Sequence, residues 1–419
     1  MKLNYQNFFF NKIPFYLTCL IPILLVSGPF LPDLAVSICA LIFIINSSKN
    51  NLIYYYKNIF FYIFMCFYIY LNISALISDN ILFSLKTSLP YLRFGIFALS
   101  TWYLLSTSDK LLKYFFYCFL VVFLFLEIDG IYQFIFKHNL FNYPLITTDR
   151  ISSLFGNELI LGSFFSRNYP LFFGLFFFLM EKQKLSKIII LISYIVLIFL
   201  PILTLLSGER SAFFYLCLAT IYFVIVFPKK NLIISLLFSI SIITLFAFFF
   251  NQIFFQRIYE QTKIQLTYNK EIKKRINVFS QTHEDHYRSA IKIFKDNIIF
   301  GAGPKSFRLK CTDPKYLVSD YSCVSHPHNT YVQLLSEIGI IGFLFVFFIF
   351  IILCINLINI IYEKYFLNNY ISPLKISLLT CFLITLWPLI PSGNFFTNWL
   401  NVIYYLPVGF FLWTLNKNI

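Results

Sequence analysis

Residues 326–358 read HPHNTYVQLLSEIGIIGFLFVFFIFIILCINLI and join two histidines, which can titrate, to a long apolar run. A membrane-spanning helix needs about 20 apolar residues, and this stretch supplies them. His328 therefore stands where a polar segment meets a span, and an imidazole can exchange protons near neutral pH. Asn329 follows it, then nine residues, Gly339, two residues and Gly342. The two glycines would let the helix pack closely against a neighbour.

The composition of the whole chain agrees with an integral membrane protein. The 419 residues are 59% hydrophobic and only 12% charged, whereas soluble domains have about 25% charged residues. We therefore predict an all-α polytopic fold with about twelve membrane-spanning helices. The predicted spans are 13–30, 32–46, 58–78, 90–106, 112–130, 159–180, 188–206, 210–227, 232–250, 330–358, 373–391 and 399–415.

The basic residues indicate how these spans are oriented. If the N-terminus is cytoplasmic, every basic residue on the inner side is a lysine and every arginine lies on the outer side. Short loops on the cytoplasmic side of a membrane protein are typically rich in lysine and arginine. The same rule explains part of the net charge of +15, so we do not expect a nucleic-acid partner. Both termini are predicted to be cytoplasmic.

This orientation divides the chain into three parts. Residues 1–250 hold the first nine spans, residues 251–328 form a long outer loop, and residues 329–419 hold the last three spans. Cys311 and Cys323 lie together in the outer loop, and an exported loop would allow a disulfide between them. The other cysteines fall within apolar spans and are expected to be packing residues.

The His328-Asn329 pattern and its two glycines resemble the signature of the bacterial O-antigen ligase family, which belongs with the O-antigen polymerases among bactoprenol-linked glycan transferases. Twelve spans with one large periplasmic loop between the ninth and tenth also resemble these ligases. Polymerases more often have two smaller outer loops. The alternative for His328 and Asn329 is that they cap a helix whose glycines only ease packing.

Two arginines extend the resemblance. Arg210 begins a span at its outer end, after Ser207-Gly208-Glu209, and resembles the family's Gly-x-Arg position. The family often has Leu four residues further on, whereas this chain has Phe214 there. Arg288 precedes a Gly-x-Gly-Pro turn and resembles the second arginine motif. The alternatives are an Arg210 that reaches the headgroups or pairs with Glu209, and an Arg288 on a solvated basic face.

Arg288 also belongs to a predicted amphipathic helix. Tyr287, Ala290 and their apolar neighbours recur at helical spacing, while Arg288, Lys292 and Lys295 form a basic stripe. Such a helix can lie along a membrane surface. We expect it to end at Gly301-Ala302-Gly303-Pro304, because this sequence does not continue a helix.

A further set of residues is predicted to bind substrate. Arg93 and Arg167 lie in the outer halves of their spans, where a charge is costly unless it faces a cavity, and we expect them to converge with Arg210. For Arg167 the alternative is an ion pair with Asp129 or Glu127. The complete predicted substrate-binding set is Arg93, Arg150, Arg167, Asn329, Glu337, Gly339 and Gly342.

Metal and nucleotide sites are not predicted. Four of the five histidines lie in the outer loop, but His283-Glu284-Asp285-His286 lacks the spacing of a zinc protease motif, and no phosphate-binding loop with Lys and Ser is present. We therefore expect no cofactor. The resemblance instead implies an inner-membrane glycosyltransferase with its active site on the periplasmic side.

The family resemblance also implies the reaction. The donor would be an O-antigen glycan on undecaprenyl pyrophosphate, and the acceptor a sugar hydroxyl of lipid A-core, with membrane lipid around the site. His328 would act as the base, while Arg210 and Arg288 would hold the pyrophosphate in an inverting transfer without metal. The nearer alternatives are an O-antigen polymerase and a protein O-oligosaccharyltransferase. The more distant one is a polysaccharide or lipid transporter.

Overall fold

The computed structural model describes residues 8–145, 150–227, 263 and 279–417. Every regular element in these ranges is a helix, apart from one isolated antiparallel bridge between His138 and Pro144. The predicted span 232–250, and the part of the outer loop from 251 to 278 with the exception of Lys263, lie outside the described residues.

The helices of the first half follow the predicted spans closely. They are η1 Phe8–Lys12, α2 Ile13–Val26, α3 Phe30–Asn50, η2 Ile53–Tyr56, α4 Ile59–Ile77, α5 Ile81–Ser88, η3 Leu89–Tyr91, α6 Leu92–Thr107 and α7 Lys110–Phe136. The remaining described helices are η4 Ser153–Phe155, α8 Leu161–Glu181, α9 Lys187–Leu206, α10 Arg210–Val226, α14 Gln281–Asp296, α15 Phe307–Lys310, α16 Thr330–Phe366, α17 Pro373–Thr385 and α18 Asn398–Asn416.

Length and composition identify part of this set as candidate membrane spans. Among the described helices, six are long and apolar enough to cross a membrane: Phe9–Val26, which includes α2, and α3, α4, α7, α9 and α16. α10 and α17 are apolar but shorter. The prediction of a helical membrane protein is thus confirmed, while the number of twelve spans and the outer placement of the loop stay predictions.

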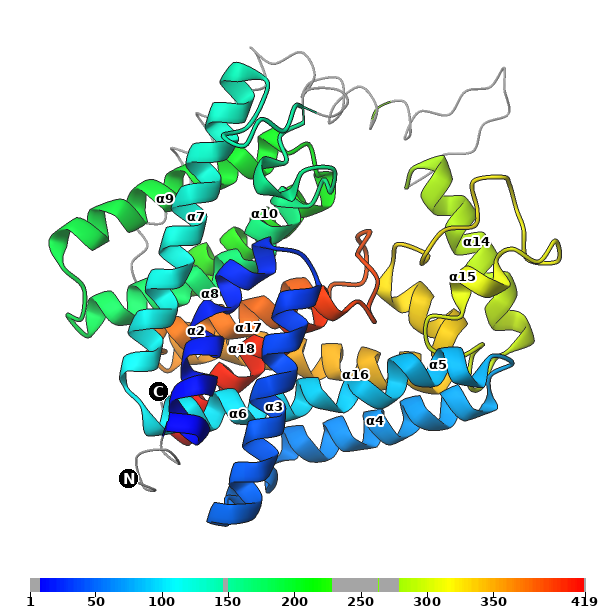
Figure 1. The fold of residues 1–419 in the computed structure, drawn as a ribbon, viewed down its shortest axis with the longest axis horizontal. Helices are drawn as coiled ribbons and strands as arrows, with labels where there is room; N and C mark the ends of the chain where they lie inside the picture. The colour runs from blue at the N-terminus through cyan, green and yellow to red at the C-terminus, as the bar shows by residue number, and fades with distance from the viewer. Residues whose placement is uncertain (1–7, 146–149, 228–262, 264–278, 418–419) are drawn as a thin grey trace.

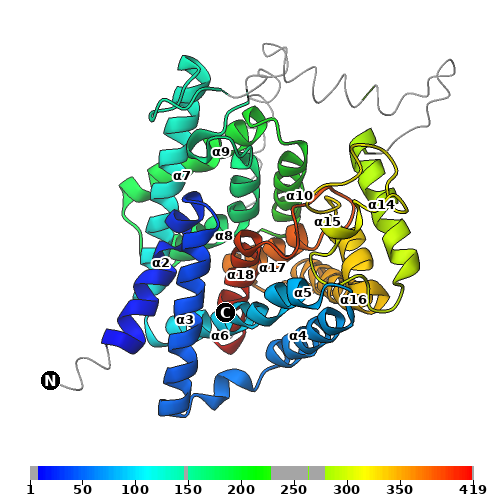
Figure 2. The same ribbon diagram turned by 45° about the vertical axis from the view of Figure 1, so that its right-hand side comes forward.

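The helices pack into one bundle with a smaller helical unit at one side (Figure 1). α8 packs against α17, α10, α9 and α7, and α18 packs against α6. Nearly every residue of α8 is buried, including Arg167, as expected for a helix enclosed on all sides. Both views place α14 beside the start of α16 (Figure 2), and these two helices are in contact.

The smaller unit has its own apolar cluster. Ala290 and Ile293 of α14 pack with Phe307, Cys311 and Tyr316. Cys311 and Cys323 form a disulfide with a Cα–Cα distance of 5.1 Å. Arg288, Lys292 and Lys295 are exposed on α14, so this helix has the basic face that its spacing predicts.

Two predicted helix ends are wrong. The span predicted at 373–391 is helical only to Thr385, because Pro388 and Pro391 lack the backbone N–H that a helix needs. The amphipathic helix ends at Asp296 rather than at Gly301. In both cases a non-helical segment follows, and both segments reach the beginning of α16.

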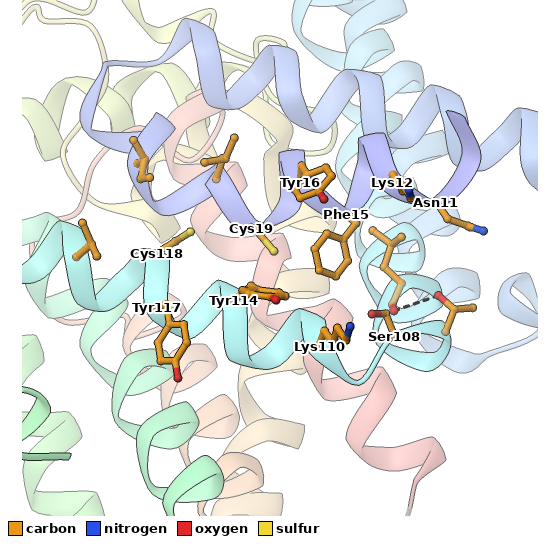
Figure 3. A pocket seen from close by; sticks show the side chains of 15 residues that line it. Asn11, Lys12, Phe15, Tyr16, Cys19, Ser108, Lys110, Tyr114, Tyr117 and Cys118 are labelled. Carbon is orange, nitrogen blue, oxygen red and sulfur yellow. Dashed lines mark hydrogen bonds between the residues drawn. The ribbon is translucent and has the colours of Figure 1, made fainter. Parts of the chain in front are cut away.

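A cavity of about 800 Å³ lies along α2 and α7, with residues of α6 on its wall. Figure 3 shows Lys12, Asn11, Lys110 and Ser108 at one end, and aromatic side chains and cysteines further along. Its apolar length suits a lipid tail. None of its lining residues belongs to α14 or α16.

Candidate functional site

His328 is held at the beginning of α16 by backbone geometry and by the helix cap. Its φ angle of 57° lies in the left-handed region, which a residue with a side chain adopts only under constraint. Asn329 caps α16, since its Oδ1 accepts hydrogen bonds from the N–H groups of Tyr331 and Val332 at 3.0 and 3.1 Å. The predicted capping alternative for Asn329 is therefore present in the structure.

The segment after α17 completes the support of His328. The N–H of Ser392 donates to the carbonyl oxygen of His328 at 2.8 Å. Asn329 Nδ2 donates to the carbonyl oxygen of Pro388 at 2.8 Å. The proline-rich segment that ended α17 early is therefore the segment that fixes the backbone of His328.

Four imidazoles gather at this point. The ring of His328 lies 4.1 Å from that of His326, 5.4 Å from His283 and 5.3 Å from His286, measured between ring centroids. His283 and His286 come from α14, and the other two from the segment before α16. We call these four residues the histidine cluster.

Hydrogen bonds orient the rings around His328. His286 Nε2 donates to the carbonyl oxygen of Tyr321 at 2.9 Å, so its Nδ1 carries the lone pair in the neutral ring. His283 Nδ1 contacts Ser280 Oγ at 2.7 Å, and His326 Nδ1 contacts Ser325 Oγ at 2.9 Å. Among the described residues, His286 Nδ1 and His326 Nε2 are buried without a hydrogen-bond partner.

Burial and crowding keep these rings neutral. Burial, together with the smaller effect of the neighbouring histidines, lowers the pKa of His328 to about 3. The pKa values of His283 and His326 fall to about 4, again mainly through burial, and that of His286 is also lowered. An unprotonated imidazole has a free lone pair, so His328 is in the form that accepts a proton.

Arg210 is the first residue of α10. Its charge is one of the causes that lower the pKa of His283. The preceding Glu209 ties this end of α10 to the start of α8, because its carboxylate accepts hydrogen bonds from Gly162 N at 2.7 Å and Ser163 Oγ at 2.7 Å. Arg150 joins the same turn, with Nε donating to the carbonyl oxygen of Ser207 at 2.7 Å.

Arg167 is buried between two tyrosines. Its guanidinium lies 5.0 Å from the ring centroid of Tyr215 and 5.8 Å from that of Tyr404. The alternative that it pairs with Asp129 or Glu127 is wrong: Asp129 instead accepts from the N–H of Leu140 and the hydroxyl of Ser153. Within the described ranges, Arg167 Nε and Nη1 have no hydrogen-bond partner.

The two other predicted arginines lie apart from this group. Arg288 is exposed on α14, one residue after Tyr287, whose pKa is raised mainly by burial. Arg93 Nε donates to Asp33 Oδ1 at 2.7 Å and lines a pocket that includes neither Arg167 nor Arg210. The expected convergence of three arginines on one cavity therefore does not include Arg93.

Glu337, Gly339 and Gly342 serve the packing of the loop that follows α14. Glu337 is fully buried, and its carboxylate accepts from the N–H groups of Lys305 at 2.9 Å and Phe307 at 3.3 Å. Gly339 breaks α16 with a φ of 69°, and a side chain there would collide with the carbonyl of Ile299. A side chain at Gly342 would collide with Ile338.

The sequence did not identify every member of the site. His328 was predicted as the base, whereas His283, His286 and His326 were considered only as metal ligands, because their separation along the chain hides their proximity in space. Within the described ranges, no group of three or more His, Cys, Asp or Glu side chains is arranged to hold a metal ion. Tyr215 and Tyr404 were not identified either, because aromatic residues are common throughout the spans.

The fold and these side chains define a helical membrane protein with histidines and arginines gathered at one end of its spans. Residues 194–347 match the family model described as O-Antigen ligase, which includes Arg210, the histidine cluster and the start of α16. This segment of the chain belongs to the O-antigen ligase family, as the sequence predicted. No curated protein matches the chain.

The family match also indicates the kind of reaction. It belongs to the O-antigen ligase and polymerase superfamily, whose members are glycan-transfer enzymes that act on lipid-linked glycans. A helical membrane protein with a site at the ends of its helices is suited to substrates whose lipid parts stay in the bilayer.

Proposed function

We propose that the protein transfers an O-antigen glycan from undecaprenyl pyrophosphate to a sugar hydroxyl of lipid A-core. The observation that carries this proposal is the packing of the His328 ring among the other three imidazoles of the histidine cluster, with the charge of Arg210 acting on His283. One group is placed to take a proton and the other to hold negative charge. Transfer from a pyrophosphate needs both.

The proposed step forms one bond and breaks one. The acceptor oxygen attacks the anomeric carbon as His328 takes its proton, and the bond from that carbon to the pyrophosphate oxygen breaks with inversion. The leaving group is undecaprenyl pyrophosphate, so the donor itself supplies the driving force and the step needs neither ATP nor metal. Positioned proton transfer of this kind contributes about 10²- to 10⁴-fold to a rate.

The arginines would stabilise the leaving group. A guanidinium offers two parallel N–H donors to phosphate oxygens, a geometry that lysine lacks. Arg210 is proposed to bind the pyrophosphate directly, with Arg150 and Arg167 on the same side of the site. The exposed position of Arg288 on α14 suits a contact with a phosphate that approaches from outside the cluster.

Bound pyrophosphate would also tune the base. Negative charge close to an imidazole raises its pKa, which moves His328 from about 3 towards the pH at which it works best. The same charge would offset the crowding of the four rings. Donor binding would therefore prepare His328 to accept the proton.

The location of the enzyme follows from the same proposal. We place it in the bacterial inner membrane, with the histidine cluster on the periplasmic side and both termini in the cytoplasm. The disulfide between Cys311 and Cys323 supports an exported loop, because disulfides persist in oxidising compartments.

The test is the lipopolysaccharide pattern of a deletion strain. We expect long-chain bands to disappear on deletion and to return with the wild-type gene. A strain that keeps core capped with a single repeat but loses the ladder would identify a polymerase instead. If lipopolysaccharide is unchanged while a glycoprotein loses its glycan, the acceptor is a protein and the ligase proposal is wrong.

A further inference from the structure

A second group of basic residues lines a pocket of about 350 Å³. The pocket lies between the beginnings of α3 and α18, the end of α5 and the loop that carries Lys305. Lys86, Arg93 and Lys305 line it together with a single carboxylate, Asp33. We call it the lysine pocket.

The one carboxylate is already engaged. Asp33 Oδ1 accepts from Arg93 Nε at 2.7 Å, and Oδ2 accepts from Asn398 Nδ2 at 2.9 Å. Among the described residues, the Nζ atoms of Lys86 and Lys305 have no hydrogen bond or ion pair. Three cations against one anion leave the pocket with an excess of positive charge.

The backbone conformation of Lys305 is constrained in this pocket. Its φ angle of 61° is left-handed, and such a residue persists only where its surroundings hold it. Glu337 of α16 does so, by accepting from the N–H of Lys305 at 2.9 Å. Burial and the charge of Arg308 lower the pKa of Lys305, so the ammonium is placed where it is not fully hydrated.

α16 links the lysine pocket with the histidine cluster, because Glu337 of α16 accepts from the N–H of Lys305 at 2.9 Å and His328 lies two residues before α16 begins. The charge of Arg308 contributes to the lowered pKa of both Lys305 and His326. Its Nε is buried and has no hydrogen-bond partner among the described residues. Arg210, by contrast, acts on His283. The cluster therefore has Arg210 near one of its rings and the lysine pocket, through Arg308, near another.

Inverting transfer requires separate binding sites for the acceptor and for the leaving pyrophosphate. The acceptor must attack the anomeric carbon from the face opposite the leaving pyrophosphate, so the two substrates approach from different sides. With the pyrophosphate near Arg210, the side that remains for the acceptor is the one near His326, Arg308 and Lys305.

We propose that the lysine pocket binds a phosphate group carried by the acceptor glycolipid, an assignment that rests on the proposed transfer reaction. Lys86 and Lys305 contact the phosphate oxygens, while Asp33 keeps Arg93 in place. The pocket thereby selects acceptors that carry phosphate over those that do not.

The test compares a phosphorylated acceptor with the same acceptor after phosphatase treatment, using purified protein and one donor. We expect wild-type protein to have the lower KM for the phosphorylated acceptor. In the double variant Lys86→Gln/Lys305→Gln that KM should rise by about 10- to 100-fold, the factor expected for losing hydrogen bonds to a charged group, and the preference should vanish. Lys295→Gln, an exposed lysine on α14, is the matched control and should keep the preference.

Two outcomes would overturn the assignment. If the double variant keeps the preference, the pocket does not recognise the acceptor phosphate. If the KM for the donor rises instead, the phosphate belongs to the donor.

A separate measurement is independent of the transfer reaction. Inorganic phosphate should raise the unfolding temperature of wild-type protein more than that of the double variant. If no glycan transfer is seen with either acceptor but this difference remains, the proposed function fails while the phosphate site stands. Equal stabilisation of both proteins would show that Lys86 and Lys305 do not form a phosphate site.

Discussion

Burial acts on both the histidine cluster and the lysine pocket, yet the chemical result differs. In the cluster, burial lowers pKa values that begin at 6.5 to about 3 or 4. In the pocket, it lowers the pKa of Lys305 from 10.5, far above neutral. The same loss of hydration therefore acts on groups whose ordinary pKa is close to neutral pH in the cluster, and on a group whose ordinary pKa is far above it in the pocket.

This difference assigns a separate task to each region. A neutral imidazole can take a proton but attracts an anion weakly, whereas a partly buried ammonium attracts an anion and has no lone pair to offer. Chemistry should therefore depend on the cluster and affinity on the lysine pocket. A substitution in the cluster that changes mainly KM, or one in the lysine pocket that changes mainly kcat, would contradict this division.

The largest expected effect is that of His328→Ala. Loss of the proton acceptor should lower kcat by about 10²- to 10⁴-fold with little change in the KM for either substrate, in contrast to the KM effect expected for the lysine pocket. The measurement is steady-state transfer by purified protein in lipid nanodiscs. His138→Ala is the control, because His138 follows α7, away from the cluster. A variant with normal kcat would exclude His328 as the base.

A smaller effect is expected for Arg210→Lys. The charge stays, but the paired N–H donors are lost, so we expect kcat to fall by about 10- to 100-fold, as for loss of a charged hydrogen bond. Arg288→Lys makes the same change at an exposed position of α14 and should have the lesser effect. If Arg288→Lys is the more damaging of the two, the leaving group is held mainly from α14, and the arrangement proposed around Arg210 is wrong.

The sequence predicted the positions of the helices better than it predicted the contacts between distant segments. Length and apolar composition define a span locally, so α4, α9 and α16 begin within one residue of their predicted positions. His328 and Arg210 were identified because they stand at span ends within spaced motifs. The histidine cluster and the lysine pocket were missed as units, because their members come from distant segments that only the fold brings together.

The partners of buried charges could not be predicted in the same way. Arg167 was predicted to bind substrate, with an ion pair to Asp129 or Glu127 as the alternative, but the chain places it between Tyr215 and Tyr404. The substrate-binding role of Glu337 stays a prediction, and its carboxylate contacts the N–H groups of the Lys305 loop. A sequence shows which residues are costly to bury but not which partner satisfies them.

The smallest expected effect concerns stability at acid pH, and it tests the comparison directly. The folded protein keeps His283 and His326 neutral down to a pH of about 4, whereas the unfolded chain takes up these protons from about pH 6.5. The unfolded state therefore binds more protons between these limits, and stability is complete above pH 6.5 and declines as the pH falls towards 4.

His326→Gln removes one of these groups and should make the decline shallower. The ring of His326 lies 4.1 Å from that of His328. Burial and the charges of Arg308, His286 and His283 oppose the protonation of His326 by lowering its pKa, while a backbone group of Ser392 acts in the opposite direction. The unfolding temperature in nanodiscs at pH 7.5, 6 and 5 measures the slope, and His138→Gln should leave it as in wild type. Parallel curves for His326→Gln and wild type would mean that the imidazole takes up its proton at the same pH in the folded protein as in the unfolded chain. The cluster would then bind anions as the lysine pocket does, and the division between the two regions would be lost.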